Sequence, residues 1–167
     1  MLVSNKINIA VIGATGYTGL DLVFMLAKHP RVKIVHLCAT KNLGKNISFF
    51  DRRIKKKLPK ISPISKILWK NLDIVFLSLP NGEAQKIIKK TYYKFNKLKY
   101  IDLSADFRIT DPKIYKKNYK IKHKAPNLIK DSIYSISEFS KKKINNFRII
   151  SNPGCYPCLL YTSPSPR

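Results

Sequence analysis

Short apolar runs and amphipathic segments alternate from the start of the chain. Residues 7–12 (INIAVI) and residues 32–39 (VKIVHLCA) are apolar and rich in β-formers, which predicts two buried strands. Between them apolar residues recur at helical spacing, at Leu20, Val23, Phe24 and Ala27. The pattern predicts a strand, a helix and a second strand, which together have the size of one βαβ unit.

The same alternation continues to residue 151. Further strands are predicted over residues 73–79, 100–103, 132–136 and 147–151, and helical segments over residues 83–93, 111–119 and 137–144. Residues 41–70 show no clear period and contain Pro59 and Pro63, so we expect loops with at most a short helix there. Strands that alternate with helices predict an α/β fold of the Rossmann type, a doubly wound, mostly parallel sheet covered on both faces.

Length and composition narrow the class of protein. The chain has 167 residues, which suits one domain of ordinary size, and 44% of them are hydrophobic, which is enough for a buried core. No apolar run approaches the ~20 residues of a membrane span, and the first residues lack the apolar region of a secretory signal. We therefore expect a cytoplasmic protein that does not bind a membrane.

The charge of the chain first suggests nucleic acid as a partner. Thirty-three basic residues against 9 acidic ones give a net charge of +24. The lysines are spread along the whole chain, however, and an A/T-rich genome would also favour Lys, Ile and Asn codons. We therefore expect no nucleic-acid partner, although a basic field attracts small anionic substrates.

A glycine-rich turn follows the first strand. Gly13, Gly16 and Gly19 have the spacing G-x-x-G-x-x-G. In dinucleotide-binding turns the first glycine permits the turn, the second lets the backbone approach a pyrophosphate, and the third lets the helix pack on the strand. The expected cofactor contacts here are Gly13, Thr15, Gly16, Tyr17, Thr18 and Gly19. A glycine-rich turn without a ligand is the alternative.

The end of the second strand indicates which dinucleotide binds. NAD-binding folds place an acid there for the ribose 2′-hydroxyl, but this chain has Thr40 and Lys41. A hydroxyl and a cation suit a 2′-phosphate, which favours NADP (NADPH), unless Lys41 is simply one more solvated lysine. The turn at Pro80 and Asn81, after the strand over residues 73–79, is expected to contribute the remaining cofactor contacts.

Cys155 follows the last predicted strand within the segment Ser-Asn-Pro-Gly-Cys-Tyr-Pro-Cys. A thiolate at a strand end and helix start attacks carbonyl carbon well, so Cys155 is a candidate nucleophile. Cys155 and Cys158 as a redox dithiol, or both as inert thiols, are the alternatives. A metal site is not expected, because there is no second cysteine pair and the histidines are scattered.

Polar side chains are concentrated over residues 102–108 (DLSADFR), directly after a strand. Loops at strand carboxyl ends bind ligands in open α/β sheets. Arg108 can clamp a phosphate or carboxylate, and Ser104 and Asn152 are expected to contact the substrate with it. A local Asp–Arg pair that only orders the loop is the alternative.

Together these segments resemble the N-acetyl-γ-glutamyl-phosphate reductase family. The matching segments are residues 13–19 (GATGYTG), 29–30 (HP), 73–82 (DIVFLSLPNG), 101–108 (IDLSADFR), 134–138 (YSISE) and 151–157 (SNPGCYP). The resemblance implies NADPH-dependent reduction of an acyl phosphate in arginine biosynthesis. In that reaction Cys155 displaces phosphate, and the resulting thioester is reduced to the semialdehyde. It also implies a histidine acid–base in a second domain and a homo-oligomer.

The chain also departs from the family pattern. The family has Y-G-L-P-E at residues 134–138 and Thr at Cys158, and its substrate domain begins where this chain stops. We therefore expect residues 1–150 to form an NADP-binding Rossmann domain, residues 151–159 to begin the cysteine segment, and residues 160–167 to be a non-native tail. The fragment alone is expected to be inactive. An aspartate-semialdehyde dehydrogenase-like enzyme and a non-catalytic nucleotide-binding module are the alternatives.

Overall fold

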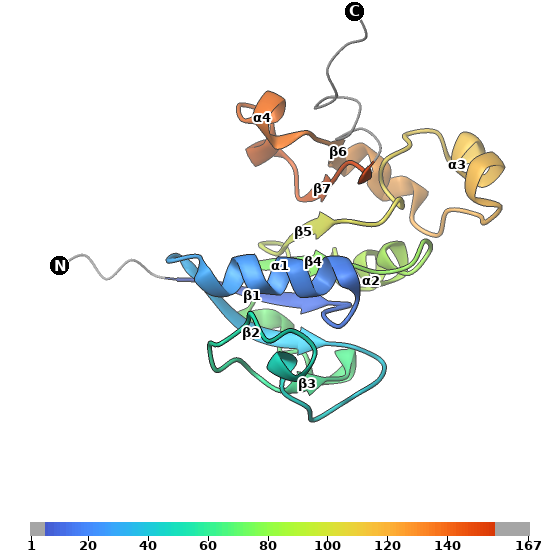
Figure 1. The fold of residues 1–167 in the computed structure, drawn as a ribbon. Helices are drawn as coiled ribbons and strands as arrows, with labels where there is room; N and C mark the ends of the chain where they lie inside the picture. The colour runs from blue at the N-terminus through green and yellow to red at the C-terminus, as the bar shows by residue number, and fades with distance from the viewer. Residues whose placement is uncertain (1–5, 156–167) are drawn as a thin grey trace, which may run out of the picture.

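Seven parallel strands form one sheet in the order β3-β2-β1-β4-β5-β7-β6 (Figure 1). The structure is a computed structural model and describes residues 6–155. The strands are β1 (Ile7–Ile12), β2 (Val32–Cys38), β3 (Ile61–Ser62), β4 (Ile74–Leu77), β5 (Lys99–Asp102), β6 (Ser132–Tyr134) and β7 (Ile149–Ser151).

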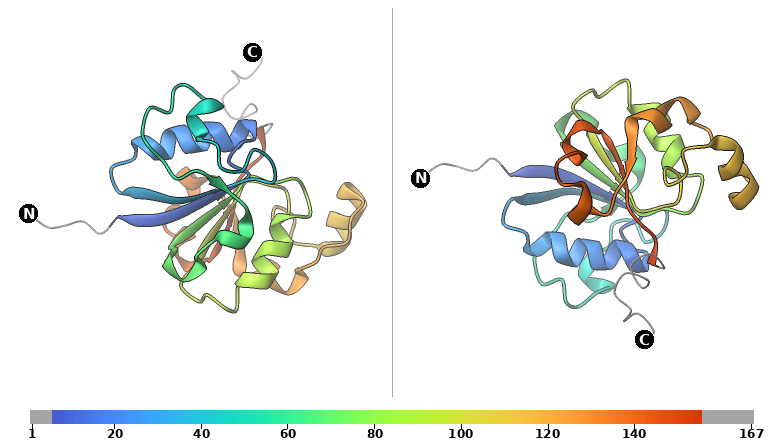
Figure 2. Two further views of the ribbon diagram at one scale, coloured as in Figure 1. Left: turned by 90° about the horizontal axis from the view of Figure 1, so that it is seen from below. Right: turned by 90° about the horizontal axis from the view of Figure 1, so that it is seen from above.

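Helices connect these strands. The α-helices are α1 (Tyr17–Lys28), α2 (Ala84–Thr91), α3 (Pro112–Tyr119) and α4 (Ser137–Ser140). Short 3-10 helices are η1 (Ile47–Phe49), η2 (Ile64–Lys66), η3 (Trp69–Asn71), η4 (Pro126–Asp131) and η5 (Ile144–Asn146). Figure 2 shows α1 and α2 on opposite faces of the sheet. The predicted doubly wound α/β fold is confirmed, and the sheet of the described residues is parallel throughout rather than mostly so.

Among the strands of the described residues, β3 is the one that the sequence pattern did not predict. It lies within residues 41–70, for which we expected loops, and it pairs with β2 through Leu37 and Ile61. A strand of two residues offers no alternation to detect. Its position is set by β2, whose outer edge accepts it.

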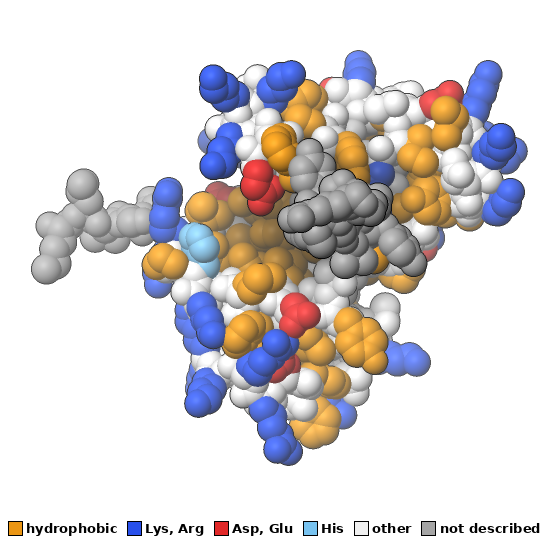
Figure 3. Space-filling view, turned by 45° about the horizontal axis from the view of Figure 1, so that its top comes forward, with side chains coloured by type: hydrophobic (Ala, Val, Ile, Leu, Met, Phe, Trp, Pro, Cys, Tyr) orange, Lys and Arg blue, Asp and Glu red, His pale blue; other side chains and the backbone are white. Residues whose placement is uncertain are grey.

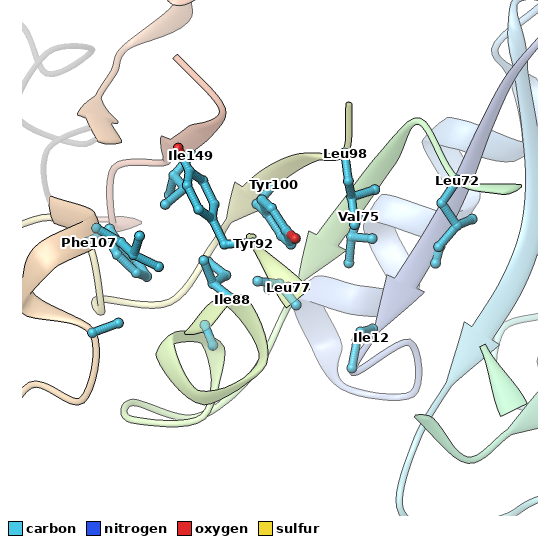
Figure 4. Packing of buried hydrophobic residues seen from close by; sticks show 14 of the residues in the cluster. Ile12, Leu72, Val75, Leu77, Ile88, Tyr92, Leu98, Tyr100, Phe107 and Ile149 are labelled. Carbon is cyan, nitrogen blue, oxygen red and sulfur yellow. The ribbon is translucent and has the colours of Figure 1, made fainter. Parts of the chain in front are cut away.

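The face of the sheet toward α2 carries the larger part of the core. Ile12, Leu77, Tyr100 and Ile149 point to this face from four strands and pack with Ile88 of α2 (Figure 4). Tyr100 is fully buried, and its hydroxyl donates to Thr91 Oγ1 at 2.9 Å. Because the polar atom has a partner, the ring can be buried without an unsatisfied group.

The opposite face is covered less completely. Helix α1 lies over β1 and β2, and residues 9–12 of β1 are at most 1% exposed. In β4 and β5 burial alternates, so that Ile74, Phe76 and Ile101 remain half-buried on the α1 side. Figure 3 shows an apolar hollow on this side of the molecule. The described residues thus cover both faces of the sheet at β1, whereas at β4 and β5 they cover the α2 side fully and the α1 side only in part.

Candidate functional site

The strand order reverses between β1 and β4, where one half of the sheet continues through β2 and the other through β5. At such a switch point the loops leave in opposite directions and open a crevice at the carboxyl ends of the strands. A cleft of about 400 Å³ lies at this point. Its lining is formed by Ile12, Gly13, Thr15, Gly16, Ala39, Thr40, Ile64, Ser78, Leu79, Pro80, Glu83 and Ile87.

The three glycines of the turn have different steric surroundings. Gly13 has a φ of +86°, and a Cβ there would lie 1.9 Å from the carbonyl oxygen of Ser78. A Cβ on Gly19 would lie 2.1 Å from the carbonyl oxygen of Gly13. A Cβ on Gly16, by contrast, would meet only that same oxygen, at 3.6 Å. Close packing therefore requires glycine at positions 13 and 19, whereas the backbone at Gly16 is open toward the cleft.

The start of α1 is suited to an anion. Gly16 is the N-cap residue, and no side chain caps the helix there. The first N–H groups of a helix lack intrahelical partners, and the helix dipole adds a partial positive charge at this end. An open backbone at Gly16 beside this helix start, next to the apolar wall formed by Ile64 and Leu79, fits a dinucleotide with its pyrophosphate on α1.

Asp106 connects the loop after β5 to the loop after β4. Its buried carboxylate accepts hydrogen bonds from the N–H groups of Gly82 at 2.7 Å and Gln85 at 3.0 Å, and from the Tyr115 hydroxyl at 2.7 Å. The first two donors lie at the start of α2, so the carboxylate binds where the helix dipole favours a negative charge. Asp106 thereby holds the turn at Pro80, which lines the cleft.

Asp102 and Ser104 shape the first part of the same loop. Asp102 Oδ1 accepts from the Ser104 N–H at 2.9 Å and from its hydroxyl at 2.6 Å, whereas Asp102 Oδ2 has no partner among the described residues. Burial raises the pKa of Asp102 to about 6. The Ser104 hydroxyl also accepts from the Asp106 N–H at 3.2 Å, so this predicted substrate contact lies inside the turn.

Arg108 bridges two loops rather than pairing with a carboxylate. Its Nε donates to the carbonyl oxygen of Asn152 at 2.8 Å, and its Nη2 donates to that of Leu103 at 2.9 Å. The alternative of a local Asp–Arg pair is therefore wrong. The pairing was not predictable from the sequence because Asn152 is 44 residues away along the chain.

The two cysteines in the described part of the chain differ sharply. Cys155 follows β7 and is exposed, whereas Cys38 is buried at the end of β2. Burial raises the pKa of the Cys38 thiol to about 11, which makes it a poor nucleophile. Cys158, and with it the alternative of a redox dithiol, lies outside the described residues.

Over residues 8–147 the sequence matches the family described as semialdehyde dehydrogenase, NAD binding domain. The chain belongs to this family. Two curated relatives named N-acetyl-γ-glutamyl-phosphate reductase support the predicted resemblance. The protein of Ehrlichia canis is 46% identical over 156 residues, and that of Rhodospirillum rubrum is 39% identical over 157 residues. Each alignment covers 92% of this chain but only 44% and 45% of the relative, so this chain spans less than half of their length.

Solved semialdehyde dehydrogenases share the fold of this domain. Aspartate semialdehyde dehydrogenase II from Vibrio cholerae has a TM-score of 0.65 and 19% identity, over 93% of this chain and 40% of that one. The enzyme from Candida albicans, solved with NADP, has a TM-score of 0.53 and 18% identity, over 96% and 48% of the two chains. At this identity the likeness shows the fold alone. Within residues 6–155, no helix of the semialdehyde dehydrogenase domain is long and apolar enough to span a membrane.

The cleft contains half of the residues predicted to contact the cofactor. Gly13, Thr15, Gly16, Thr40 and Pro80 line it, whereas Tyr17, Thr18, Gly19, Lys41 and Asn81 do not. Tyr17 is 95% exposed. Sequence reasoning missed the other cleft residues, which are Ile12, Ala39, Ile64, Ser78, Leu79, Glu83 and Ile87. Ile87 lies on the predicted apolar face of a helix. The pattern of residues 41–70, by contrast, gave no indication that Ile64 of η2 would line the cleft.

The histidines of the domain contact main-chain groups. His123 is buried, its Nε2 donates to the carbonyl oxygen of Asp106 at 2.8 Å, and its Nδ1 accepts from the Ala125 N–H at 3.1 Å. Burial lowers the pKa of His123, in keeping with a neutral ring. His29 and His36 each accept a main-chain N–H, at 3.2 Å. His123 is thus a structural residue rather than an available acid–base group.

Proposed function

We propose that this chain is the cofactor-binding part of an N-acetyl-γ-glutamyl-phosphate reductase. The reaction is the NADPH-dependent conversion of N-acetyl-γ-glutamyl phosphate to N-acetylglutamate semialdehyde with release of phosphate. The observation that carries the proposal is the exposed Cys155 at the carboxyl end of β7. In the parallel sheet this end lies on the same edge as the cleft at Gly13 and Gly16. The reaction proposed here is the one that the names of the curated relatives describe.

The end of β2 supports NADP over NAD. An acidic side chain that would bind a ribose 2′-hydroxyl is missing after Cys38, where the chain continues with Ala39, Thr40 and Lys41. Thr40 lines the cleft and offers a hydroxyl without a negative charge. Exposed Lys41 adds a cation within one residue of it. This combination is compatible with a 2′-phosphate.

The Cys155 thiolate would act as the nucleophile. Its sulfur bonds to the acyl carbon, the carbon–oxygen bond to phosphate breaks, and phosphate leaves with the bonding electron pair. NADPH, when bound in the cleft, would supply a hydride for the acyl carbon. The carbon–sulfur bond then breaks, and the thiolate returns as the aldehyde forms. The covalent step divides one difficult reduction into two easier ones.

Substrate contacts in this proposal come from the loops beside Cys155. Arg108 would attract the anionic acyl phosphate, and Asn152 lies beside it in space, because its carbonyl oxygen accepts from Arg108 Nε. Ser104 would contribute through the turn that it forms with Asp102, since its hydroxyl is already engaged. The acid–base histidine would come from chain beyond these residues, because the ring nitrogens of His123 both have main-chain partners.

The relatives contain further chain that this sequence does not have. The half-buried Ile74, Phe76 and Ile101 leave an apolar face that further chain would cover. We therefore propose that residues 1–158 alone do not turn over substrate and associate through this face, despite the charge of +24. The complete protein would be a cytoplasmic homo-oligomer.

The test is an assay of the complete chain that the gene encodes, with NADPH oxidation followed in the presence of N-acetyl-γ-glutamyl phosphate. Cys155→Ser should lower kcat by about 10³-fold or more while NADPH still binds. Aspartyl phosphate is the competing substrate that tests the aspartate-semialdehyde alternative. Equal turnover of both acyl phosphates, or full activity of Cys155→Ser, would contradict the proposal.

A further inference from the structure

The main chain before Cys155 is held at both of its hydrogen-bonding groups. The Asn152 N–H donates to the carbonyl oxygen of Asp102 at 2.8 Å, which continues the pairing of β5 and β7 by one residue. The Asn152 carbonyl accepts from Arg108 Nε at 2.8 Å. Residue 152 therefore cannot rotate without losing one of these bonds, and Cys155 is three residues further on.

The guanidinium of Arg108 is itself fixed. Its Nη2 donates to the carbonyl oxygen of Leu103 at 2.9 Å, so the planar group spans from the loop after β5 to the loop after β7. Arginine suits this task because its donors form a rigid fork, whereas a lysine ammonium acts as a point charge. A side chain that is hydrogen-bonded to both loops fixes the position of one loop relative to the other.

Gly154 packs against the guanidinium of Arg108. A Cβ at this position would lie 2.9 Å from Arg108 Nη1 and 3.6 Å from its Cζ. An unanchored arginine would swing away from such a Cβ, but this one would have to give up its bonds to Leu103 and Asn152. The absence of a side chain at Gly154 thus lets the guanidinium pack against the main chain one residue before Cys155.

We propose that Arg108, with Gly154, is the positioning residue for the Cys155 thiol. This role rests on the proposed function and deepens it, because Arg108 acts on the nucleophile segment and not only as an anion ligand. Misplacing a reacting group by ~1 Å can cost ~10²-fold in rate. Loosening the contact therefore lowers kcat, while removal of a substrate ligand alone would raise KM.

The variants are Arg108→Lys and Gly154→Ala, made singly and together in the complete chain. Arg148→Lys is the matched control. Arg148 donates to the carbonyl oxygens of Leu98, Tyr92 and Phe95 at the opposite end of β5 and β7, and like Arg108 it is half-buried. Two readouts are needed, amide hydrogen exchange of residues 149–155 without ligands, and kcat and KM for the acyl phosphate.

Arg108→Lys and Gly154→Ala should each speed exchange of the Asn152 amide by about 10-fold and lower kcat by about 10- to 100-fold, with KM changed by less than about 3-fold. The double variant should be little worse than either single one, because both changes break the same contact. Arg148→Lys should leave kcat and exchange at Asn152 unchanged.

A raised KM with unchanged kcat and unchanged exchange would overturn the proposal, since Arg108 would then act only as a substrate ligand. The same loss of kcat in Arg148→Lys would also overturn it, because the effect would be one of general stability. The exchange measurement needs no substrate. It therefore decides the positioning role even if the wild-type protein proves not to reduce the acyl phosphate.

Discussion

The two ends of the β5–β7 pair are each held by an arginine, in different ways. At the amino end Arg148 donates to three main-chain carbonyls and stacks 3.9 Å above the ring of Tyr92. At the carboxyl end Arg108 donates to two carbonyls and packs against a glycine beside an exposed cysteine. An arginine thus joins main-chain segments at the amino end and supports the loop that carries Cys155 at the carboxyl end. This difference is expected when ligands bind at strand carboxyl ends.

The largest effect is expected at the glycine turn of the carboxyl end. Gly13→Ala should cost about 4 kcal/mol or more of unfolding free energy, because the new Cβ collides with Ser78 and the φ of +86° is strained. Urea denaturation measures this loss. Gly16→Ala is the control, because its Cβ fits. It should unfold within about 1 kcal/mol of wild type yet bind NADPH at least about 10-fold more weakly. Equal stability of the two variants would refute the steric argument.

Asp102 should make the carboxyl end sensitive to pH. Its pKa is raised from 3.8 to about 6 in the folded state, so the folded protein holds more protons than the unfolded chain between these values. The unfolding free energy therefore falls as pH rises through this window, by about 3 kcal/mol in total.

The comparison variant for this dependence is Asp102→Asn, which lacks the ionisable group. Relative to wild type, its unfolding free energy should rise by about 2–3 kcal/mol from about pH 4 to about pH 7. Urea unfolding at both pH values measures the difference. A constant difference between the two proteins would show that folding does not raise the pKa of Asp102.

The exposed thiol at the carboxyl edge of the sheet should react faster than the thiol buried in the core. With a limiting amount of iodoacetamide at about pH 8, Cys155 should be alkylated at least about 100-fold faster than Cys38, which is buried and has a pKa of about 11. Peptide mass mapping gives the ratio. In urea the two rates should become similar, and preferential labelling of Cys38 in the folded protein would contradict the structure.

The smallest effect is expected at the amino end. Arg148→Ala should lower the unfolding free energy by about 2 kcal/mol, because three partly buried carbonyls lose a charged donor and Tyr92 loses its stacked partner. Affinity for NADPH should stay unchanged, since Arg148 lies at the edge opposite the cleft. A weakened affinity would mean that the two ends are coupled.

Most of the fold followed from local pattern. Apolar runs and helical spacing predicted β1, α1 and β2 to within one residue at most strand ends, and the spacing of three glycines predicted a turn between the first strand and the first helix. The segment at residues 102–108 was recognised as important, but its internal partners were not. The hydrogen bonds that the Gly82 and Gln85 N–H groups donate to the Asp106 carboxylate join residues more than twenty positions apart, and no local period in the sequence indicates them.

The sequence by itself determined the alternation of strands and helices, the need for glycine in the turn, and the placement of a cysteine after the last strand. These depend on backbone conformations and periods that extend over a few residues. Only the tertiary structure decided that β3 joins the edge of β2, that Ile64 lines the cleft, and that Arg108 binds the main chain near Cys155. Such contacts are set by strand order and register, which bring distant segments to one edge of the sheet.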